Sequence, residues 1–400
     1  MQIPDLFVIL GILLTAGILT GHVAITVTTL NVTYGQGWIA RKVLRSVRLL
    51  HDMVLFLGTP LLAWVCFRAG CFTQFDTTQL PPAALIYFAF AALVGWIVVP
   101  MVLLRRWTRR LPEAQLSNHG HTIDVADRLG HRPIGSGPKR LMAYWPGNEQ
   151  FQLEVLERTY QLPRLRPELD GLSILHLSDL HFTGTVGIEY FEEVFEEAGK
   201  LECDIVAVTG DLVDQHSCYE WVTRLLGKLH GRLASYAILG NHDSWYDHER
   251  IRRDLVHVGY RVLSGRWEIL PVAEQSLVVA GTESPWMGGL PDLSAAPPDA
   301  FRLLLSHTPD NAPWASRIGF DLMLAGHNHG GQVRLPLIGP VFMPSRFGCR
   351  FDMGAFQIGP TLIHVSRGIS GKHPFRWRCR PELTKLVLRA VADGAVSVPT

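Results

Sequence analysis

Charged side chains are scarce in this chain. Asp, Glu, Lys and Arg together make up only 18% of the 400 residues, whereas apolar residues make up 48%. The formal net charge is +1, so the chain lacks the basic excess that would indicate nucleic-acid binding, and we expect no nucleic-acid partner. This composition is typical of a protein in which membrane segments dilute a soluble part.

The cysteines show neither CxxC pairs nor the spacing of a zinc site. The six positions are Cys66, Cys71, Cys203, Cys218, Cys349 and Cys379. We expect buried or incidental reduced thiols, and only Cys66 and Cys71 could lie near an oxidising side. Internal repeats and coiled-coil heptads are also missing, which excludes solenoid and long coiled-coil architectures.

Two long stretches contain no charged residue at all. Residues 7–30 and 81–104 each exceed the roughly 20 residues that cross a bilayer core. The apolar stretch 53–67 is shorter and contains Pro60, so it is either a third span with interfacial ends or a buried core helix. The first stretch has no basic residue before it and is too long for a cleaved signal peptide. We therefore predict a membrane region with about three transmembrane helices in residues 1–110.

The basic residues near these stretches predict their orientation, because Lys and Arg are retained on the cytoplasmic side. They are Arg41, Lys42, Arg45 and Arg48 after the first stretch, and Arg105, Arg106, Arg109 and Arg110 after the last. The other side offers only Asp5, Arg68 and Asp76. We expect a multi-pass protein of the cell (inner) membrane, with an outside N-terminus and a cytoplasmic catalytic domain.

The remaining chain divides into a polar segment and an alternating one. Residues 111–150 are rich in Gly, His and Pro and predict a linker with little regular structure, in which His119 and His121 are solvated. Residues 151–400 are expected to form the catalytic domain. Strand-length apolar runs there alternate with amphipathic helical segments: strands at 174–178, 205–209, 236–239, 277–280, 303–305, 322–325 and 361–365, and helices at 188–201, 219–229 and 250–258. This alternation predicts an α/β fold, a β-sandwich flanked by helices.

Five polar motifs follow these apolar runs. They are Asp179-Leu-His181, Gly210-Asp211, Gly240-Asn241-His242-Asp243, His307 and Gly326-His327-Asn-His329. Each motif alone has an ordinary explanation as a cap or a turn. Together they supply carboxylates, an amide and imidazoles at the carboxyl ends of strands, where α/β folds place their sites. The pattern therefore predicts a two-metal centre and a metal-dependent phosphoester hydrolase.

The same motifs, with Asp214 four residues after Gly210 and Gln332 closing the last one, resemble the calcineurin-like metallophosphoesterase superfamily. The resemblance covers about residues 172–388 and excludes the membrane region and the linker. Residues 330–336 and 380–383 look like a bacterial membrane-associated phosphoesterase branch. Some members of that branch cleave the pyrophosphate of UDP-2,3-diacylglucosamine in lipid A synthesis.

The resemblance implies a role for each motif residue. One metal would be held by Asp179, His181, Asp211 and His329, and the other by Asp211, Asn241, His307 and His327. Asp211 would bridge the two ions. His242 would not bind metal; it would face the phosphoryl group and stabilise or protonate the leaving oxygen, oriented by Asp243.

Mixed imidazole and carboxylate ligands suit Mn, Fe, Zn or Ni better than Mg or Ca, which prefer oxygen-only shells. We therefore expect two divalent metal ions as cofactors, with Mn as the first choice to test. Substrate contacts are less defined: Arg334, Arg346, Arg367 and Lys372 are candidates for a second phosphate, and ordinary surface charge is an equal alternative. The apolar loops 284–290 and 335–343 could admit an acyl chain, although covering the core is the more usual role.

Three functions are compatible with these observations. The first is a membrane-anchored two-metal phosphodiesterase or pyrophosphatase acting on a lipid-linked or nucleotide-linked phosphate such as UDP-2,3-diacylglucosamine, because anchoring raises the effective concentration of a lipid substrate. The second is a phosphodiesterase for a soluble nucleotide. The third is a non-catalytic membrane sensor or scaffold, against which the intact ligand set argues.

Overall fold

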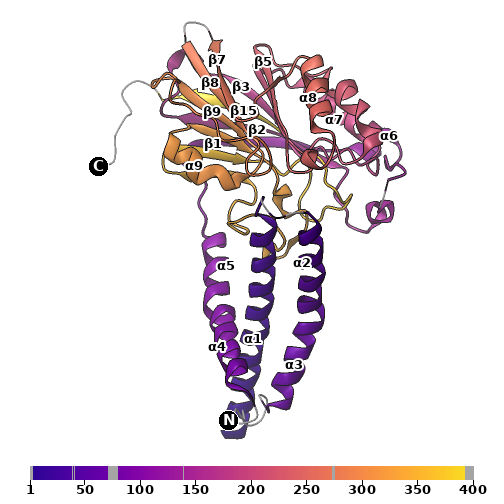
Figure 1. Ribbon diagram of the computed structural model, residues 1–400, viewed down its shortest axis with the longest axis vertical. Coiled ribbons are helices and arrows are strands. Elements are labelled where there is room, and N and C mark those ends of the chain that lie inside the picture. Colours follow the sequence, from indigo (N-terminus) through magenta and orange to yellow (C-terminus); the bar gives the residue numbers. More distant parts are fainter. Residues whose placement is uncertain are drawn as a thin grey trace. The chain divides into compact units, whose positions relative to one another are not determined.

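The computed structural model describes residues 3–37, 39, 41–70, 80–137, 139–272 and 275–391. Its contacts divide the chain into two compact units. One unit contains Met1–Arg110 together with Pro344–Gly348, and the other contains Leu111–Met343 together with Cys349–Thr400. Figure 1 traces the helices of the first unit and the sheets of the second.

The first unit is built from long apolar helices. Its elements are α1 (Ile3–Tyr34), α2 (Arg41–Met53), the π-helical turn η1 (Val54–Gly58), α3 (Thr59–Arg68), α4 (Pro82–Leu93), the π-helical turn η3 (Val94–Val98) and α5 (Val99–Trp107). By length and composition, three continuous helices could cross a membrane: Leu6–Tyr34, Lys42–Arg68 and Pro82–Trp107. The middle helix is longer than the apolar stretch 53–67 because the basic amphipathic α2 extends it toward its N-terminus.

Small residues allow α1 to approach α4 and η3 closely. A Cβ atom on Gly21 would lie 1.8 Å from the Ala91 carbonyl oxygen, and one on Gly95 would lie 2.0 Å from the Gly17 carbonyl oxygen. Since apolar burial does not drive helices together within lipid, such close backbone contact is a main source of helix association there. His22 of α1 adds polar contacts, to the Tyr87 hydroxyl and to the Val54 carbonyl oxygen at 3.3 Å.

The second unit contains two large β-sheets. The first has the strand order β1-β2-β15-β3-β4-β5-β6 and the second β13-β14-β10-β9-β8-β7, with β11 and β12 as a separate pair. The strands are β1 (Gln115–Asp124), β2 (Gln152–Leu162), β3 (Ser173–Leu177), β4 (Ile205–Thr209), β5 (Ala234–Ile238), β6 (Arg261–Val262), β7 (Arg266–Val272), β8 (Gln275–Thr282), β9 (Phe301–Ser306), β10 (Leu322–Ala325), β11 (Arg334–Leu335), β12 (Gly339–Pro340), β13 (Gly354–Ile358), β14 (Thr361–Val365) and β15 (Glu382–Ala390). Strands β3, β4 and β5 are parallel, as are β8, β9, β10 and β14.

Strand periodicity divides the apolar side chains between three cores. In β4, Val206 and Val208 face the core shared with α7 (Ile188–Lys200) and α8 (His248–His257), whereas Ile205 and Ala207 face the core between the two sheets. On the second sheet, Leu304 faces outward to the core shared with α9 (Ala312–Ile318). The result is a β-sandwich with helices on both outer faces, as the sequence predicted (Figure 1).

The expectation of a linker at 111–150 is wrong. Residues 115–124 form β1, which pairs with β2 in antiparallel register over Gln115–Asp124, and α6 (Val125–Leu129) follows directly. This strand lies at the sheet edge, with His119 and His121 exposed, so its polar side chains gave no apolar alternation to detect. The predicted helix at 219–229 is reduced to short 3₁₀ and π-helical turns, at His216–Cys218 and Val222–Leu226.

A buried ion cluster links β2, β15 and the loop after β14. The Glu382 carboxylate accepts from Arg158 Nη2 at 3.1 Å and from Arg367 Nε at 2.6 Å, and Arg367 Nη2 also contacts Glu154 at 2.6 Å. Arg158 Nη1 lies 3.2 Å from Nδ1 of His364. Burial raises the pKa of Glu382, but Arg158 and Arg367 outweigh it and hold that pKa well below the ordinary value of 4.5. Glu382 is therefore a buried anion that holds two arginines in place.

Replacing Glu382 by Gln should destabilise the fold by about 3 kcal/mol or more, because two buried guanidinium groups lose their counter-charge. The folded pKa is depressed, so this stabilisation is complete above pH 4.5 and is lost as pH falls toward the folded pKa. Thermal unfolding of the detergent-solubilised full chain should show a lower Tm for E382Q at pH 7, and a smaller difference from the wild type below pH 4.5. An equal difference at both pH values would contradict this account.

Candidate metal centre

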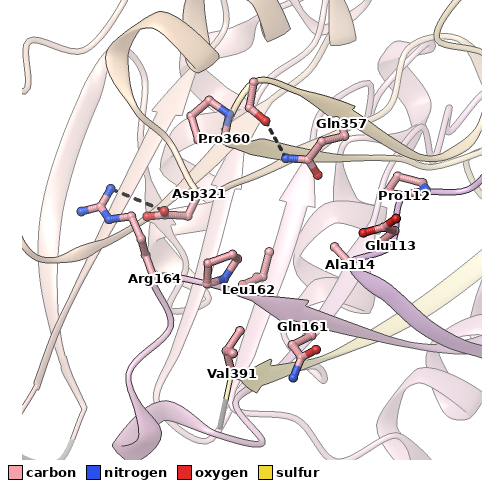
Figure 2. Close-up of a pocket in the computed structure, with 12 residues that line it drawn as sticks. Pro112, Glu113, Ala114, Gln161, Leu162, Arg164, Asp321, Gln357, Pro360 and Val391 are labelled. Carbon is pink, nitrogen blue, oxygen red and sulfur yellow. Dashed lines mark hydrogen bonds and ion pairs between the residues drawn. The ribbon is translucent and has the colours of Figure 1, made fainter. Parts of the chain in front are cut away.

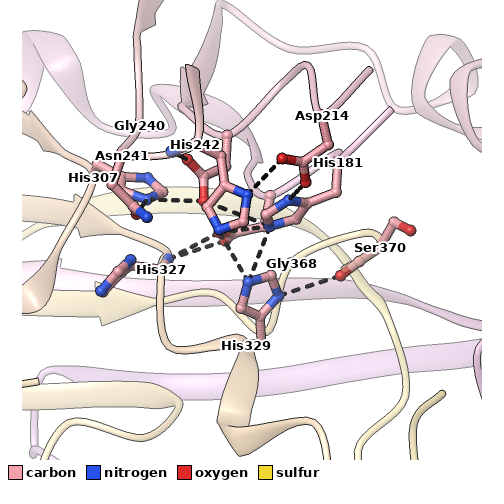
Figure 3. A network of polar contacts seen from close by, with 12 residues as sticks. His181, Asp214, Gly240, Asn241, His242, His307, His327, His329, Gly368 and Ser370 are labelled. Carbon is pink, nitrogen blue, oxygen red and sulfur yellow. Dashed lines mark hydrogen bonds and ion pairs between the residues drawn. The ribbon is translucent and has the colours of Figure 1, made fainter. Parts of the chain in front are cut away.

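The predicted ligands all follow the carboxyl ends of parallel strands. Asp179 and His181 come after β3, Asp211 after β4 and Asn241 after β5 in the first sheet; His307 follows β9, and His327 and His329 follow β10 in the second. Because both sheets present these ends at the same edge of the sandwich, residues separated by 150 positions meet there. Figure 3 shows the imidazoles of His181, His307, His327 and His329 turned toward one another.

The side chains form two groups that share one carboxylate. Ligand atoms of Asp179, His181, Asp211 and His329 lie within 4.8 Å of one another, and so do those of Asp211, His307 and His327. Asp211 Oδ2 lies 3.5 Å from His181 Nε2 and 3.3 Å from His307 Nε2, between the two groups. Asn241 Oδ1 lies 3.0 Å from His307 Nε2 and so joins the second group.

The hydrogen bonds of three histidines fix which ring nitrogen carries a lone pair. Nδ1 of His181 faces Asp214 Oδ2 at 2.6 Å, Nδ1 of His307 faces the Thr209 carbonyl oxygen at 2.7 Å, and Nδ1 of His329 faces the Ser370 carbonyl oxygen at 3.2 Å. Since these oxygens can only accept, each neutral ring donates from Nδ1 and keeps its lone pair on Nε2. His181 Nε2 and His329 Nε2 are nevertheless only 3.1 Å apart. The two nitrogens can lie this close when one ring carries an additional proton or when both rings bind one metal ion.

The buried carboxylates of the site also require positive charge nearby. Asp179 and Asp211 are almost completely buried, and within the described part of the chain no lysine or arginine forms an ion pair with either of them. Burial lowers the pKa of His307, but the Asp211 carboxylate outweighs burial and raises it to about 9. Buried carboxylates require compensating positive charge. The donor set of carboxylate, amide and imidazole therefore fits two divalent transition-metal ions.

The backbone at the ligands is unusual. Asp179, His181, Asp211, His327 and His329 all have positive φ, between 45° and 67°, in the left-handed region that side chains other than glycine rarely adopt. Strain of this kind persists where the surrounding structure enforces a functional geometry. The glycines near the ligands allow close approach: a Cβ on Gly240 would lie 2.1 Å from Asp211 Oδ1, and one on Gly326 would lie 2.4 Å from Asp179 Oδ2.

His242 is oriented by Asp214 and not by Asp243. His242 Nδ1 lies 2.6 Å from Asp214 Oδ1, while the other oxygen of Asp214 holds His181, so one carboxylate fixes a predicted ligand and the predicted acid together (Figure 3). Burial raises the pKa of Asp214, but His242 and His181 lower it well below the ordinary value. Asp214 is therefore ionised, and Nε2 of His242 takes no part in this contact.

Asp243 has a different structural role from the one expected. Its carboxylate accepts four backbone N–H groups, from Asp211, Leu212, Val213 and Gly240, at 2.8–3.0 Å. The side chain is completely buried and makes no hydrogen bond with the His242 ring. Burial and the neighbouring Asp211 raise the pKa of Asp243 to about 7. Asp243 thus joins the loops after β4 and β5, and Asp214, quoted in the sequence motif without a role, takes over the orientation of His242.

The candidate substrate contacts separate into two kinds. Arg334 pairs with Asp352 at 2.9 Å and Arg367 pairs with Glu382 and Glu154, so both have structural partners. Arg346 belongs to the segment that clusters with the helical unit. Lys372 lies near the predicted acid's loop, with its ammonium 5.0 Å from the ring of Trp245.

Two tryptophans that the sequence did not single out as site residues lie against the histidines. Trp245 stacks on His242 with ring centroids 4.1 Å apart, and Trp286 lies 4.8 Å from His327 and 5.6 Å from His307. Trp245 lies two residues after the Gly240–Asp243 motif, and Trp286 falls in the apolar loop 284–290. Their proximity to the motifs was the only available signal, since tryptophan more often covers a core.

A separate cavity of 550 Å³ lies at the opposite edge of the sheets. It is bordered by Arg164 and Asp321, which form an ion pair at 3.4 Å, and by Leu162, Gln357 and Pro360 (Figure 2). Asp321 precedes β10, whereas His327 follows the same strand, so the cavity and the metal-ligand cluster are at different ends of β10. This cavity has no cluster of metal ligands among the described residues.

Comparison with known proteins supports the class defined by this fold and site, a metal-dependent phosphoester hydrolase. The calcineurin-like phosphoesterase family matches residues 172–331. YkuE, an uncharacterized metallophosphoesterase of Bacillus subtilis, is 30% identical over 251 residues, which are 60% of this chain and 87% of the relative. The chain belongs to the calcineurin-like phosphoesterase family.

Other relatives have more informative names. The phosphodiesterase YaeI of Escherichia coli is 30% identical over 220 residues, 54% of this chain and 81% of the relative. A bovine transmembrane protein with metallophosphoesterase domain is 28% identical over 264 residues, 58% of this chain but only 56% of the relative. The UDP-2,3-diacylglucosamine pyrophosphatase LpxG of Chlamydia trachomatis is 25% identical over 291 residues, 58% of this chain and 88% of the relative.

Replacing Asp214 by Asn should reduce activity or metal affinity by about 10- to 100-fold with little change in Tm. The amide has one accepting oxygen, so either His181 or His242 is forced into the wrong tautomer. Asp243→Asn is the contrasting variant: it should lower Tm, because at least one of four buried N–H groups loses its acceptor. Metal titration and thermal unfolding of both proteins test this. A D243N protein with normal Tm beside a fully active D214N protein would reverse the two roles.

Proposed function

We propose that this chain is a membrane-anchored two-metal phosphodiesterase or pyrophosphatase. The observation that carries the proposal is the convergence of the Nε2 atoms of His181, His307 and His329 around the buried carboxylates of Asp179 and Asp211, a donor set that fits two divalent ions. Asp179, His181, Asp211 and His329 would hold one ion, and Asp211, Asn241, His307 and His327 the other. Bound divalent ions would supply Lewis-acid polarisation of the phosphoryl group and activation of the attacking water.

The protein itself would supply orientation and a proton. Asp214 accepts from Nδ1 of His242, which leaves Nε2 as the atom that donates a proton to the leaving oxygen. Trp245 packs on the His242 ring and restricts its rotation. Trp286, beside His307 and His327, restricts water access to the other side of the cluster.

For the substrate we propose a lipid-linked or nucleotide-linked phosphate such as UDP-2,3-diacylglucosamine. Support comes from the similarity to LpxG and from three helices that are apolar and long enough to cross a membrane. An anchored enzyme meets a lipid substrate at high effective concentration. A soluble nucleotide is the second candidate; the similarity to YaeI supports phosphodiester hydrolysis, and that name specifies no substrate.

Activity measurements on different phosphate esters distinguish these proposed functions. With Mn²⁺, the detergent-solubilised full chain should hydrolyse bis(p-nitrophenyl) phosphate, and Asp211→Asn should abolish this because the shared carboxylate is lost. His242→Ala should lower kcat by about 10²–10⁴-fold, the usual contribution of a general acid, without reducing bound metal. UDP-2,3-diacylglucosamine and a soluble nucleotide diester are then compared by kcat/KM. Undiminished activity of D211N would disprove the site assignment, and inactivity on every ester would favour a non-catalytic sensor.

The apolar helices and the similarity to a transmembrane relative indicate membrane association. We further propose that the chain crosses the inner membrane three times with its catalytic unit in the cytoplasm, because Lys42, Arg45 and Arg48 begin the second helix while Arg105 and Arg106 end the third.

A cysteine placed at the exposed Ser136 tests this orientation, in a background where the six native cysteines are replaced by serine. An impermeant maleimide should label it only after the cells are opened, because the reagent cannot cross the inner membrane. A cysteine at Thr77, between the second and third helical segments, should be labelled in intact cells once the outer barrier is permeabilised. The reverse labelling pattern would require the opposite topology.

A further inference from the structure

One exposed segment of the second unit combines apolar, aromatic and basic side chains. This basic-aromatic segment consists of Lys139, Arg140, Leu141, Tyr144 and Trp145, in and around the 3₁₀ turn Arg140–Tyr144. Leu141 is 77% exposed, Tyr144 58% and Trp145 64%. Large apolar side chains that are exposed together and bordered by charge mark an interaction surface.

The turn itself directs these side chains outward. Residues three apart lie on the same side of a 3₁₀ helix, so Leu141 and Tyr144 share one side. Ala143 is buried instead and belongs to the core shared with α7 and α8. Its carbonyl oxygen accepts from Arg132 Nη1 at 3.3 Å and from Asn148 Nδ2 at 3.2 Å. The exposed side chains are therefore presented by a turn that is fastened to the domain.

The charge around the segment has one sign. Residues 129–148 contain no Asp or Glu, whereas they include Arg132, Lys139 and Arg140. Within the described part of the chain, Arg140 forms no ion pair, and Lys139 Nζ contacts the imidazole of His373 at 2.9 Å and no carboxylate. Aromatic rings settle at the headgroup level of a bilayer, and cations beside them are attracted to anionic headgroups. The segment thus has the chemistry of a lipid-surface contact.

The segment is attached to loops around the metal-ligand cluster. Gly135 N donates to the Thr185 carbonyl oxygen at 2.9 Å, in the loop that follows His181. Asn148 Nδ2 donates to the Pro374 carbonyl oxygen at 2.8 Å, in the loop after β14 whose Ser370 carbonyl oxygen accepts from His329. A lipid surface in contact with the segment would therefore lie on the side of the domain that carries these loops.

We infer that the basic-aromatic segment docks on an anionic lipid bilayer and turns the candidate metal centre toward the lipid surface. This inference rests on the membrane anchoring in the proposed function. Residues 108–114 alone connect α5 to β1, which is about 30 Å at full extension, so an anchored domain meets the bilayer at high effective concentration. Leu141 and Trp145 enter the boundary between headgroups and acyl chains, and Arg140 contacts lipid phosphates.

The depth of insertion tests the docking independently of turnover. The full chain carries Leu141→Cys in a background where the native cysteines are replaced by serine, is labelled with the fluorophore NBD and is placed in nanodiscs. In phosphatidylcholine discs that contain phosphatidylglycerol, the emission should shift to shorter wavelength and be quenched by lipids with a nitroxide near the headgroup. The same label at Val256→Cys of α8, a position that is 60% exposed, should show neither change.

Two further substitutions separate the charge from the apolar insertion. Arg140→Gln should lower the ratio of docked to undocked protein about fivefold in the anionic discs, as expected for one cation at a charged surface, and less in phosphatidylcholine alone. Trp145→Ser should lower this ratio in both lipids, because the ring no longer anchors the turn at the headgroups. Arg253→Gln removes an exposed arginine of α8 that has no ion pair among the described residues, and this matched control should change neither value.

Hydrogen exchange of the unlabelled wild-type chain in the same nanodiscs excludes an effect of the label. The amides of residues 140–145 should exchange more slowly when anionic lipid is present. A label that stays unquenched, together with unchanged exchange, would overturn the docking even if the protein hydrolyses phosphate esters. A shifted emission that nitroxide lipids do not quench would indicate a protein contact and would also overturn it. A lipid-quenched label in a chain without turnover would remove the hydrolase proposal and keep the docking.

Discussion

The constraint on which the site depends is the burial of two carboxylates without a lysine or arginine partner among the described residues. Asp179 and Asp211 lie between the two sheets' ligand loops, where the free energy of an uncompensated charge would be prohibitive. The ring nitrogens of His181, His307 and His329 lie beside these carboxylates. The histidines therefore compensate the negative charge of the carboxylates only if they carry protons, and metal binding would displace those protons. The site thus lacks the positive charge needed to balance its carboxylates, and two divalent cations would supply it.

Holding these groups together requires support from outside the ligand set. Asp214 fixes His181 and His242 with its two oxygens, and Asp243 fastens the loops after β4 and β5 through four backbone N–H groups. The positive φ values of five predicted ligands show that the loops adopt an unfavourable backbone to bring the side chains inward. The stable sandwich beneath, with three apolar cores, can offset this cost.

The sequence predicted the buried strands and the ligand loops well, because both leave local signals. Strands β3, β4 and β10 read as short apolar runs, and a Ser-Asp, Gly-Asp or Gly-His step follows them, respectively. The prediction from the sequence failed at β1, because an exposed edge strand does not need apolar residues. It also failed at β15, which was not predicted although it is a central strand of the first sheet and pairs with β2 and β3. It also assigned the orientation of His242 to its neighbour Asp243. Hydrogen-bond partners depend on how loops from different strands meet, which spacing along the chain does not specify.

The same reasoning explains why reaction class is easier to infer than substrate. The ligands are contiguous motifs at strand ends, whereas side chains near the site such as Lys372 come from other loops of the chain. In the sequence Lys372 reads as an ordinary surface charge, and only the fold shows its ammonium 5.0 Å from the Trp245 ring, which stacks on His242. Selectivity between esters would then arise from side chains beyond the metal ligands, and relatives with the same ligand set could act on different esters by changing only these loops.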